Sequence, residues 1–89
     1  MSIKIIVSFK VEDVDSFLSA FATGVHVRNE AGFTAEAFEN MDAPNNVVII
    51  GEAPSKEAFT KFFADPDVQD RMKNAGVNSL PKITLLRSR

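Results

Sequence analysis

The sequence predicts an α+β fold in which a four-stranded antiparallel sheet carries helices on one face. Three observations predict it. Residues 3–11 alternate in the two-residue period of a strand, and residues 46–53 form an apolar run directly after a turn-like segment. Two further segments, one in each half of the chain, place apolar residues at helical spacing. With 89 residues, the chain is expected to form one domain over 1–89.

The first half of the chain predicts a strand, a helix and a second strand. Residues 3–11 (IKIIVSFKV) direct Ile3, Ile5, Val7, Phe9 and Val11 to one face. Asp13 or Asp15 can cap the helix that follows, and Gly24 is expected to end it in a left-handed conformation. Residues 30–40 are β-like but weakly patterned, and we interpret them as the second strand. The apolar stripe of the helix consists of Val14, Phe17, Leu18, Phe21 and Val25.

The second half predicts a turn, a strand, an interrupted helix and a last strand. Residues 42–46 (DAPNN) are rich in turn formers, and residues 46–53 are apolar on both faces, as in a central strand buried on both sides. Ser55 is expected to cap a helix, which Asp65 and Pro66 restart and Gly76 ends. Residues 82–87 form the last strand. The buried stripe of the helix consists of Ala58, Phe59, Phe62 and Phe63.

The resulting order is strand, helix, strand, strand, helix, strand, which is the ferredoxin-like βαββαβ arrangement. Strands 3–11 and 46–53 are expected side by side in the middle of the sheet. Right-handed crossovers place both helical segments on the same face.

The sheet face without helices predicts a homodimer. Ile6 is expected on this open face, with either Val48 and Ile50 or Val47 and Ile49, and with Leu86 or Leu85. Monomers rarely expose large contiguous apolar patches, so a second copy is expected to cover this one by two-fold symmetry. The alternative is a monomer whose open face is semi-polar, because Lys4, Ser8 and Lys10 also lie on it.

The element order, the chain length and the segment EAPSKEAFTKFFADPDVQDRMKNAGV (52–77) resemble the dimeric α+β barrel superfamily. In that superfamily an aromatic stripe on the second helix precedes a small residue, an Asp-Pro or Ser-Pro step and a short further helix. The matching positions here are Phe59, Phe62, Phe63, Ala64, Asp65 and Pro66. Members include cofactor-free quinol monooxygenases of antibiotic biosynthesis, haem-degrading monooxygenases, isomerases, cyclases and stress-responsive barrel proteins. The resemblance implies a homodimer with a small cavity between sheet and helices in each protomer.

Composition narrows the classes of function. The chain has no cysteine, and its ten basic and twelve acidic residues give a net charge of −2 without a basic stripe for nucleic acid. It has no apolar run long enough for a signal peptide or a membrane span, so a cytoplasmic protein is expected. A single histidine with scattered carboxylates shows no metal-ligand spacing, and we expect no metal and no cofactor.

His26 is the candidate catalytic residue, because an imidazole exchanges protons near neutral pH. It could equally be a partly exposed residue of the connection after the first helix. Arg28 could hold a carboxylate or phenolate through its planar fork, or it could pair with Glu30 or with an acidic residue of a partner chain. The other candidates for substrate binding are Lys4, Glu36, Phe21 and Phe62, which could also be solvated charges and core aromatics.

The resemblance implies two alternative functions. One is a cofactor-independent enzyme, monooxygenase-like or isomerase- or cyclase-like, that acts on a small aromatic or polyketide-like substrate. The other is a non-catalytic dimer that binds a small apolar or aromatic ligand or has a structural role. Haem-degrading members of that superfamily use an asparagine on a strand, a helix histidine as iron ligand and usually a tryptophan. The resemblance therefore does not imply haem degradation, because the chain has no tryptophan, the first strand has no asparagine, and His26 follows the first helix.

Overall fold

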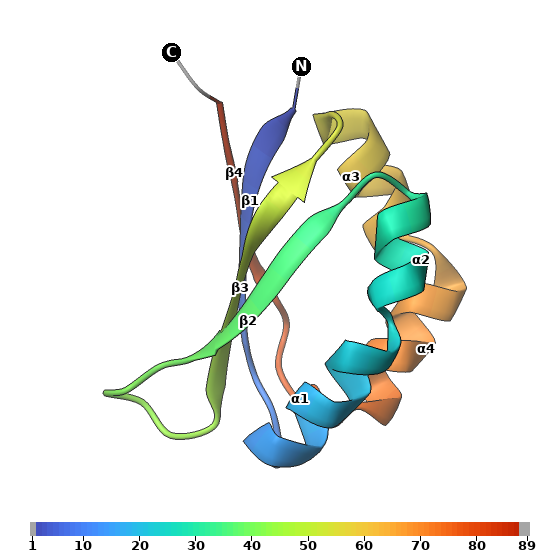
Figure 1. The fold of residues 1–89 in the computed structure, drawn as a ribbon. Helices are drawn as coiled ribbons and strands as arrows, with labels where there is room; N and C mark the ends of the chain where they lie inside the picture. The colour runs from blue at the N-terminus through green and yellow to red at the C-terminus, as the bar shows by residue number, and fades with distance from the viewer. Residues whose placement is uncertain (1, 88–89) are drawn as a thin grey trace.

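The computed structural model describes residues 2–87, except for the side chains of residues 25 and 26. Within this range four strands form one antiparallel sheet in the order β2-β3-β1-β4, and the helices cover one of its faces (Figure 1). The predicted ferredoxin-like α+β fold is therefore confirmed. In chain order the elements are β1 (Ile3–Lys10), α1 (Val14–Thr23), α2 (Val25–Glu30), β2 (Thr34–Glu39), β3 (Asn46–Ala53), α3 (Lys56–Phe63), α4 (Pro66–Asn74) and β4 (Lys82–Leu86).

Three helices begin at residues whose side chains accept hydrogen bonds from the first-turn amides, as the sequence predicts. At the start of α1, the Asp13 carboxylate accepts from the amide of Asp15 at 3.0 Å, so Asp13 is the cap. Ser55 caps α3 and Asp65 caps α4. These caps fix where α1, α3 and α4 begin over the sheet.

The segment after α1 differs from the prediction. Gly24 has φ −91° and ψ 5°, so it is not left-handed, and a second helix, α2, follows it at once. The second strand begins at Thr34 rather than at residue 30, after Gly32 with φ 80°. The sequence conceals α2 because β-branched residues such as Val27 have low helix propensity. The position of α2 against the sheet is therefore a result of tertiary packing.

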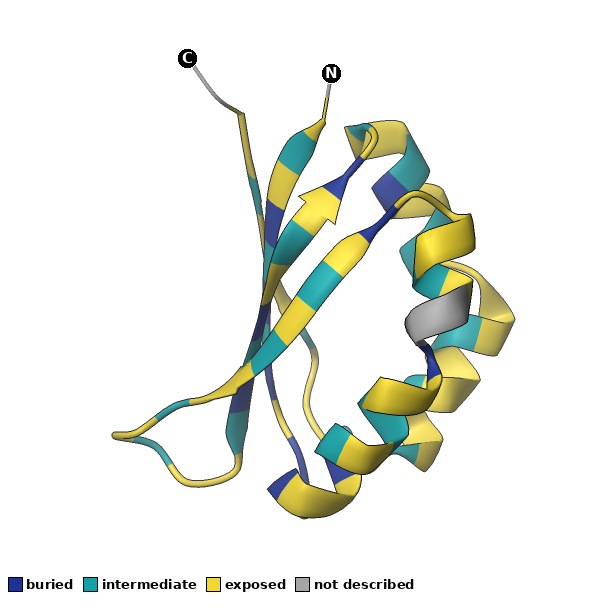
Figure 2. Ribbon diagram, viewed as in Figure 1, coloured by how far each residue is buried: buried dark blue, intermediate teal, exposed yellow. Residues whose placement is uncertain are grey.

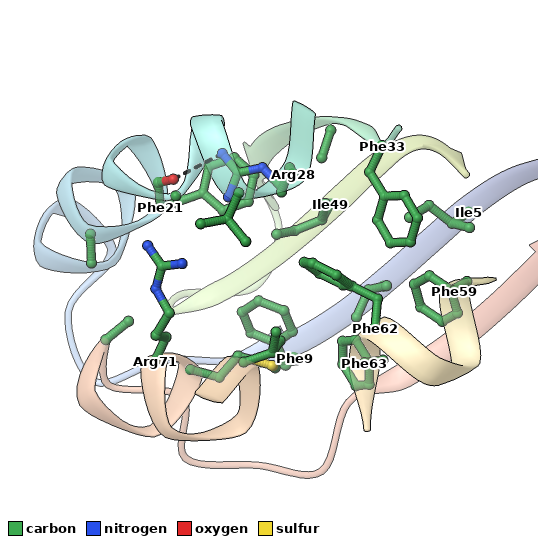
Figure 3. A pocket seen from close by; sticks show the side chains of 18 of the residues that line it. Ile5, Phe9, Phe21, Arg28, Phe33, Ile49, Phe59, Phe62, Phe63 and Arg71 are labelled. Atoms are coloured by element: carbon green, nitrogen blue, oxygen red, sulfur yellow. Dashed lines mark hydrogen bonds between the residues drawn. The ribbon is translucent and has the colours of Figure 1, made fainter. Parts of the chain in front are cut away.

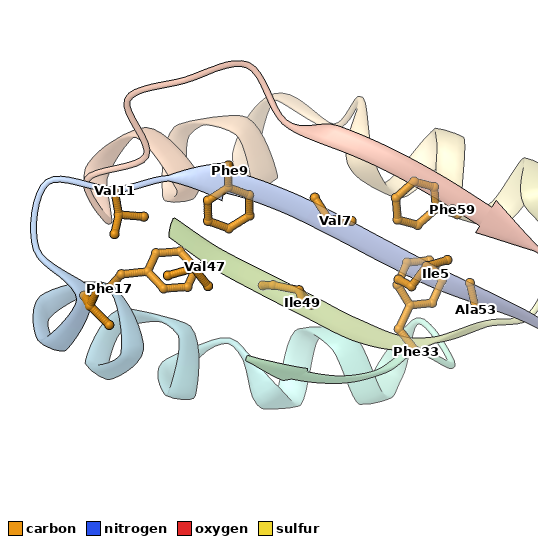
Figure 4. Packing of buried hydrophobic residues seen from close by; sticks show 11 residues of the cluster. Ile5, Val7, Phe9, Val11, Phe17, Phe33, Val47, Ile49, Ala53 and Phe59 are labelled. Carbon is orange, nitrogen blue, oxygen red and sulfur yellow. The ribbon is translucent and has the colours of Figure 1, made fainter. Parts of the chain in front are cut away.

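The core lies between the sheet and the helices (Figures 2 and 4). The alternating residues of β1 and β3 supply one side of it, and Phe17, Phe33 and Phe59 supply the other. The predicted inward face of the first strand is confirmed by four of its residues. The buried core residues are Ile5, Val7, Phe9, Val11, Val14, Phe17, Phe33, Val47, Ile49, Ala53 and Phe59.

The other face of the sheet carries no helix (Figure 1). Strand pairing places Ile6 and Ile50 side by side on this open face, with Val48 and Leu86 in adjacent rows. Ile50 is 39% exposed, so the predicted burial of β3 on both faces is wrong for the single chain. Phe38 is 47% exposed on the same face. No helix within residues 2–87 is long and apolar enough to cross a membrane.

Candidate functional site

A cavity of about 140 Å³ lies between the sheet and the helices. Seven of the eight phenylalanines line it, so its walls are mainly aromatic (Figure 3). Among the described lining residues, only Thr34, Arg28 and Arg71 are polar. The phenylalanines that line the cavity are Phe9, Phe17, Phe21, Phe33, Phe59, Phe62 and Phe63.

The aromatic side chains hold one another in place at one end of the cavity. Phe33 packs against Phe62 with ring centroids 4.6 Å apart, and Phe59 stacks on Phe63 at 5.3 Å. Paired rings of this kind add to the stabilisation that their burial provides. They give the cavity a rigid apolar wall that suits a flat apolar ligand.

Arg28 lies at the other end of the cavity and has a fixed orientation. Its Nη2 donates a hydrogen bond to the backbone carbonyl of Phe21 at 2.9 Å (Figure 3). The Cζ atom of its guanidinium lies 3.8 Å from the centre of the Phe21 ring. A hydrogen bond and a cation–π contact therefore hold the same side chain.

Arg71, in the last turn of α4, reaches the same end of the cavity (Figure 3). Its Nη2 lies 3.3 Å from the point where a Cβ on Gly24 would stand, and Nη1 of Arg28 lies 2.9 Å from that point. Gly24 has no side chain, and this leaves room for both guanidinium groups. The two arginines come from different helices and meet only in the folded chain.

The charge of Arg28 is disfavoured in this position. Burial lowers its pKa below the usual value of an arginine, and the neighbouring charge of Arg71 lowers it further. No carboxylate of the described residues acts in the opposite direction on this group. Arg28 nevertheless stays cationic at neutral pH, because an arginine starts from so high a pKa.

Of the residues predicted for the site, Arg28, Phe21 and Phe62 line the cavity. Lys4 and Glu36 lie on the open sheet face, where Lys4 stands opposite Glu52 and Glu36 opposite Ile50. They are thus separated from the cavity by the sheet itself. The prediction for His26 falls on a side chain outside the described residues, although its backbone belongs to α2.

The sequence did not single out Arg71. It lies on a strongly polar helix between Asp70 and Met72, a setting in which an arginine is ordinarily solvated. A weak signal was available, because Met72 and Val68 form an apolar side of α4 and Arg71 flanks it. No pattern along the chain relates Arg71 to Arg28.

The chemistry of the cavity follows from what lines it. Aromatic walls bind apolar rings, and two guanidinium groups stabilise negative charge on oxygen. No carboxylate is among the described lining residues, so they provide no obvious general base. Within the described part of the chain, no three acidic or histidine side chains are grouped to hold a metal.

Solved structures of other proteins share this architecture. The cofactor-independent oxygenase SnoaB from Streptomyces nogalater, as a point variant, matches 99% of this chain and 93% of its own with a TM-score of 0.72 and 20% identity. An antibiotic biosynthesis monooxygenase matches 100% of this chain and 99% of its own, with a TM-score of 0.73 and 18% identity. This chain has the antibiotic-biosynthesis-monooxygenase-like fold.

The same monooxygenase-like fold also occurs in a conserved protein from Methanosarcina mazei Go1, at a TM-score of 0.77 and 10% identity. That match covers 100% of this chain and 94% of the other. No protein-family model matches the sequence, and no curated protein matches it. At these identities the likeness establishes the fold alone.

Proposed function

We propose that this protein is a cofactor-independent oxygenase of a single-ring hydroquinone-type substrate bound between sheet and helices. The observation that carries the proposal is the aromatic-walled cavity of about 140 Å³ with two guanidinium groups at one end. An apolar cavity of about 150 Å³ in another protein holds one benzene ring, so this volume favours one ring over several. The oxygenases among proteins of this fold support the same reaction class.

The proposed reaction is a monooxygenation. A hydroquinone and O₂ give a hydroxyquinone and water: one oxygen atom replaces a ring hydrogen as a hydroxyl group, and the other leaves as water. The ring loses four electrons, and O₂ accepts them. Molecular oxygen is the only co-reactant, and it is apolar enough to enter a cavity with phenylalanine walls.

The role of the arginines in this reaction is electrostatic. The substrate must lose a phenolic proton before it can pass an electron to O₂, and this proton leaves to water at the cavity mouth. Arg28 and Arg71 stabilise the negative charge that develops on the substrate oxygen. On the cavity side, apolar side chains reduce screening of these charges by water, whereas Arg71 is also exposed to solvent.

Oxygen consumption tests the proposal. With methylhydroquinone or 2,5-dihydroxybenzoate, the protein is expected to raise O₂ uptake at least about tenfold over a protein-free control. Between pH 6 and 8.5 the rate is expected to rise, since the substrate has to ionise and both arginines stay charged throughout. Saturable binding of both compounds without O₂ uptake would contradict the oxygenase and favour a non-catalytic binding protein.

We also propose that two copies pair through the open sheet face. Phe38, Ile50 and Leu86 are each more than a third exposed there, which a monomer rarely tolerates in one patch. The pairing of Lys4 with Glu52 across the strands places both charge signs on the face. A two-fold axis through the face can set each charge against its opposite in the partner.

Light scattering tests this pairing. At about 20 µM the wild-type chain is expected to have twice its chain mass of 9.8 kDa, and Ile50→Lys is expected to be monomeric. Ile83→Lys is the matched control, because Ile83 is similarly exposed at 42% but pairs with Val7 and so lies on the helix side of the sheet. A monomeric wild type would contradict the proposed interface.

A further inference from the structure

Two positive charges meet at one end of a cavity whose walls are otherwise almost entirely apolar (Figure 3). Arg28 comes from α2 and Arg71 from α4, and both point toward the space over Gly24. One nitrogen of each side chain lies within 3.3 Å of the position that a Cβ on Gly24 would occupy. The two groups are therefore close neighbours of like charge.

Among the described residues, the side-chain hydrogen bond of the Arg28 guanidinium uses one of its nitrogens. The nitrogen that bonds to the Phe21 carbonyl is Nη2, whereas the nitrogen beside Gly24 and Arg71 is Nη1. A guanidinium has five N–H donors in a fixed plane. Because its contacts with Phe21 hold that plane in place, the donors toward Arg71 are already oriented before a ligand binds.

The like charges make an anion the natural partner at this point. Burial and Arg71 both disfavour the charged form of Arg28, and an anion between the two arginines removes that penalty. One carboxylate can bridge donors on two side chains that lie about 5–7 Å apart, because each charge-assisted bond spans about 2.8 Å. A neutral ligand provides no such compensation.

We propose that Arg28 and Arg71 together bind the carboxylate of a single-ring aromatic acid, whose ring lies against Phe21, Phe33 and Phe62. The inference deepens the proposed function, because it assigns an aromatic acid as the substrate class of the same cavity. In 2,5-dihydroxybenzoate a phenolic oxygen is ortho to the carboxylate, so the arginines that bind the carboxylate also lie beside the oxygen on which negative charge develops. The inference predicts binding whether or not oxygen reacts, so the two proposals can fail separately.

Calorimetric titration with benzoate and with benzamide, its neutral counterpart of nearly the same shape, tests the assignment. Benzoate is expected to bind at least about tenfold more tightly than benzamide. Arg71→Gln is expected to weaken benzoate binding about 10- to 100-fold and to change benzamide binding less than about twofold, because only the charge-assisted bonds are lost.

Lys73→Gln is the matched control, since it removes the same charge from the same turn of α4 outside the cavity lining. Benzoate binding is expected to stay within about twofold of wild type. Arg28→Lys keeps the positive charge but loses the planar guanidinium that can bind a carboxylate through two donors. This variant tests whether Arg71 alone is enough for binding, and it is expected to bind benzoate at least about fivefold more weakly than the wild type.

Three results would overturn the assignment. Equal affinities for benzoate and benzamide would show that charge is not recognised. Unchanged benzoate binding in both arginine variants would place the anion elsewhere. If neither compound binds while methylhydroquinone is still oxidised, the cavity serves the proposed reaction without recognising an acid.

Discussion

Replacing Gly51 by alanine is expected to destabilise the protein by about 3 kcal/mol or more, because the new methyl group would collide with the neighbouring strand. A Cβ on Gly51 would stand 1.9 Å from the backbone oxygen of Thr34 and 2.8 Å from the Cα of Ala35. Backbone atoms of a paired strand cannot rotate away as the end of a long side chain can. The first residues of β2 would therefore have to leave β3.

The expected loss is a large part of the total, since folded domains are stable by only about 5–15 kcal/mol. The melting temperature should fall by roughly 10–25 °C in a thermal denaturation followed by circular dichroism. Ser19→Ala is the control, because Ser19 is exposed on α1 and lies outside both the cavity lining and the open sheet face. A fall of only a few degrees for Gly51→Ala would show that β2 does not depend on this close approach.

Replacing Ala20 by phenylalanine is expected to abolish binding of aromatic ligands, with an affinity loss of about 100-fold or more. Ala20 lies on α1 and lines the cavity, so a phenyl ring there would occupy the space that a ligand ring needs. A cavity of about 140 Å³ has room for about one such ring. The melting temperature is expected to stay within a few degrees or rise, because filling a cavity adds contacts.

Ala22→Phe makes the same substitution on the same helix at an exposed position that does not line the cavity. Benzoate affinity in this control, measured by calorimetry, is expected to match the wild type. If Ala20→Phe folds and still binds benzoate with wild-type affinity, the ligand does not lie between sheet and helices.

Local patterns were sufficient to predict most of the fold. The two-residue alternation of β1 identified its inward face, and the caps Asp13, Ser55 and Asp65 marked three helix starts. The open face was also predictable, except for two choices that the sequence left open. These were Val48 and Ile50 against Val47 and Ile49, and Leu86 against Leu85. Both choices depend on how the strands pair. Ser8 pairs with Val48 and Lys4 pairs with Leu86, so Val48 and Leu86 lie on the open face.

The candidate site was much less predictable, because tertiary packing creates it. The helix α2 was not predicted, because it follows Gly24 and contains β-branched residues, which have low helix propensity. Without this helix, nothing in the sequence indicated where the Arg28 side chain lies. Arg71 lies on a polar helix far along the chain, and only folding brings it over Gly24. Lys4 was a candidate for substrate binding, although the alternation along the first strand already places it on the open face, away from the cavity.

The position of a bound aromatic acid tests the central claim most directly. Ile5 and Ile49 line the cavity, whereas Ile6 and Ile50 follow them in the chain and lie on the open face. In a sample with ¹³C-labelled isoleucine methyl groups, the ring protons of benzoate should give intermolecular nuclear Overhauser effects to Ile5 and Ile49. Effects to Ile6 and Ile50 instead would place the ligand on the open sheet face and contradict the account.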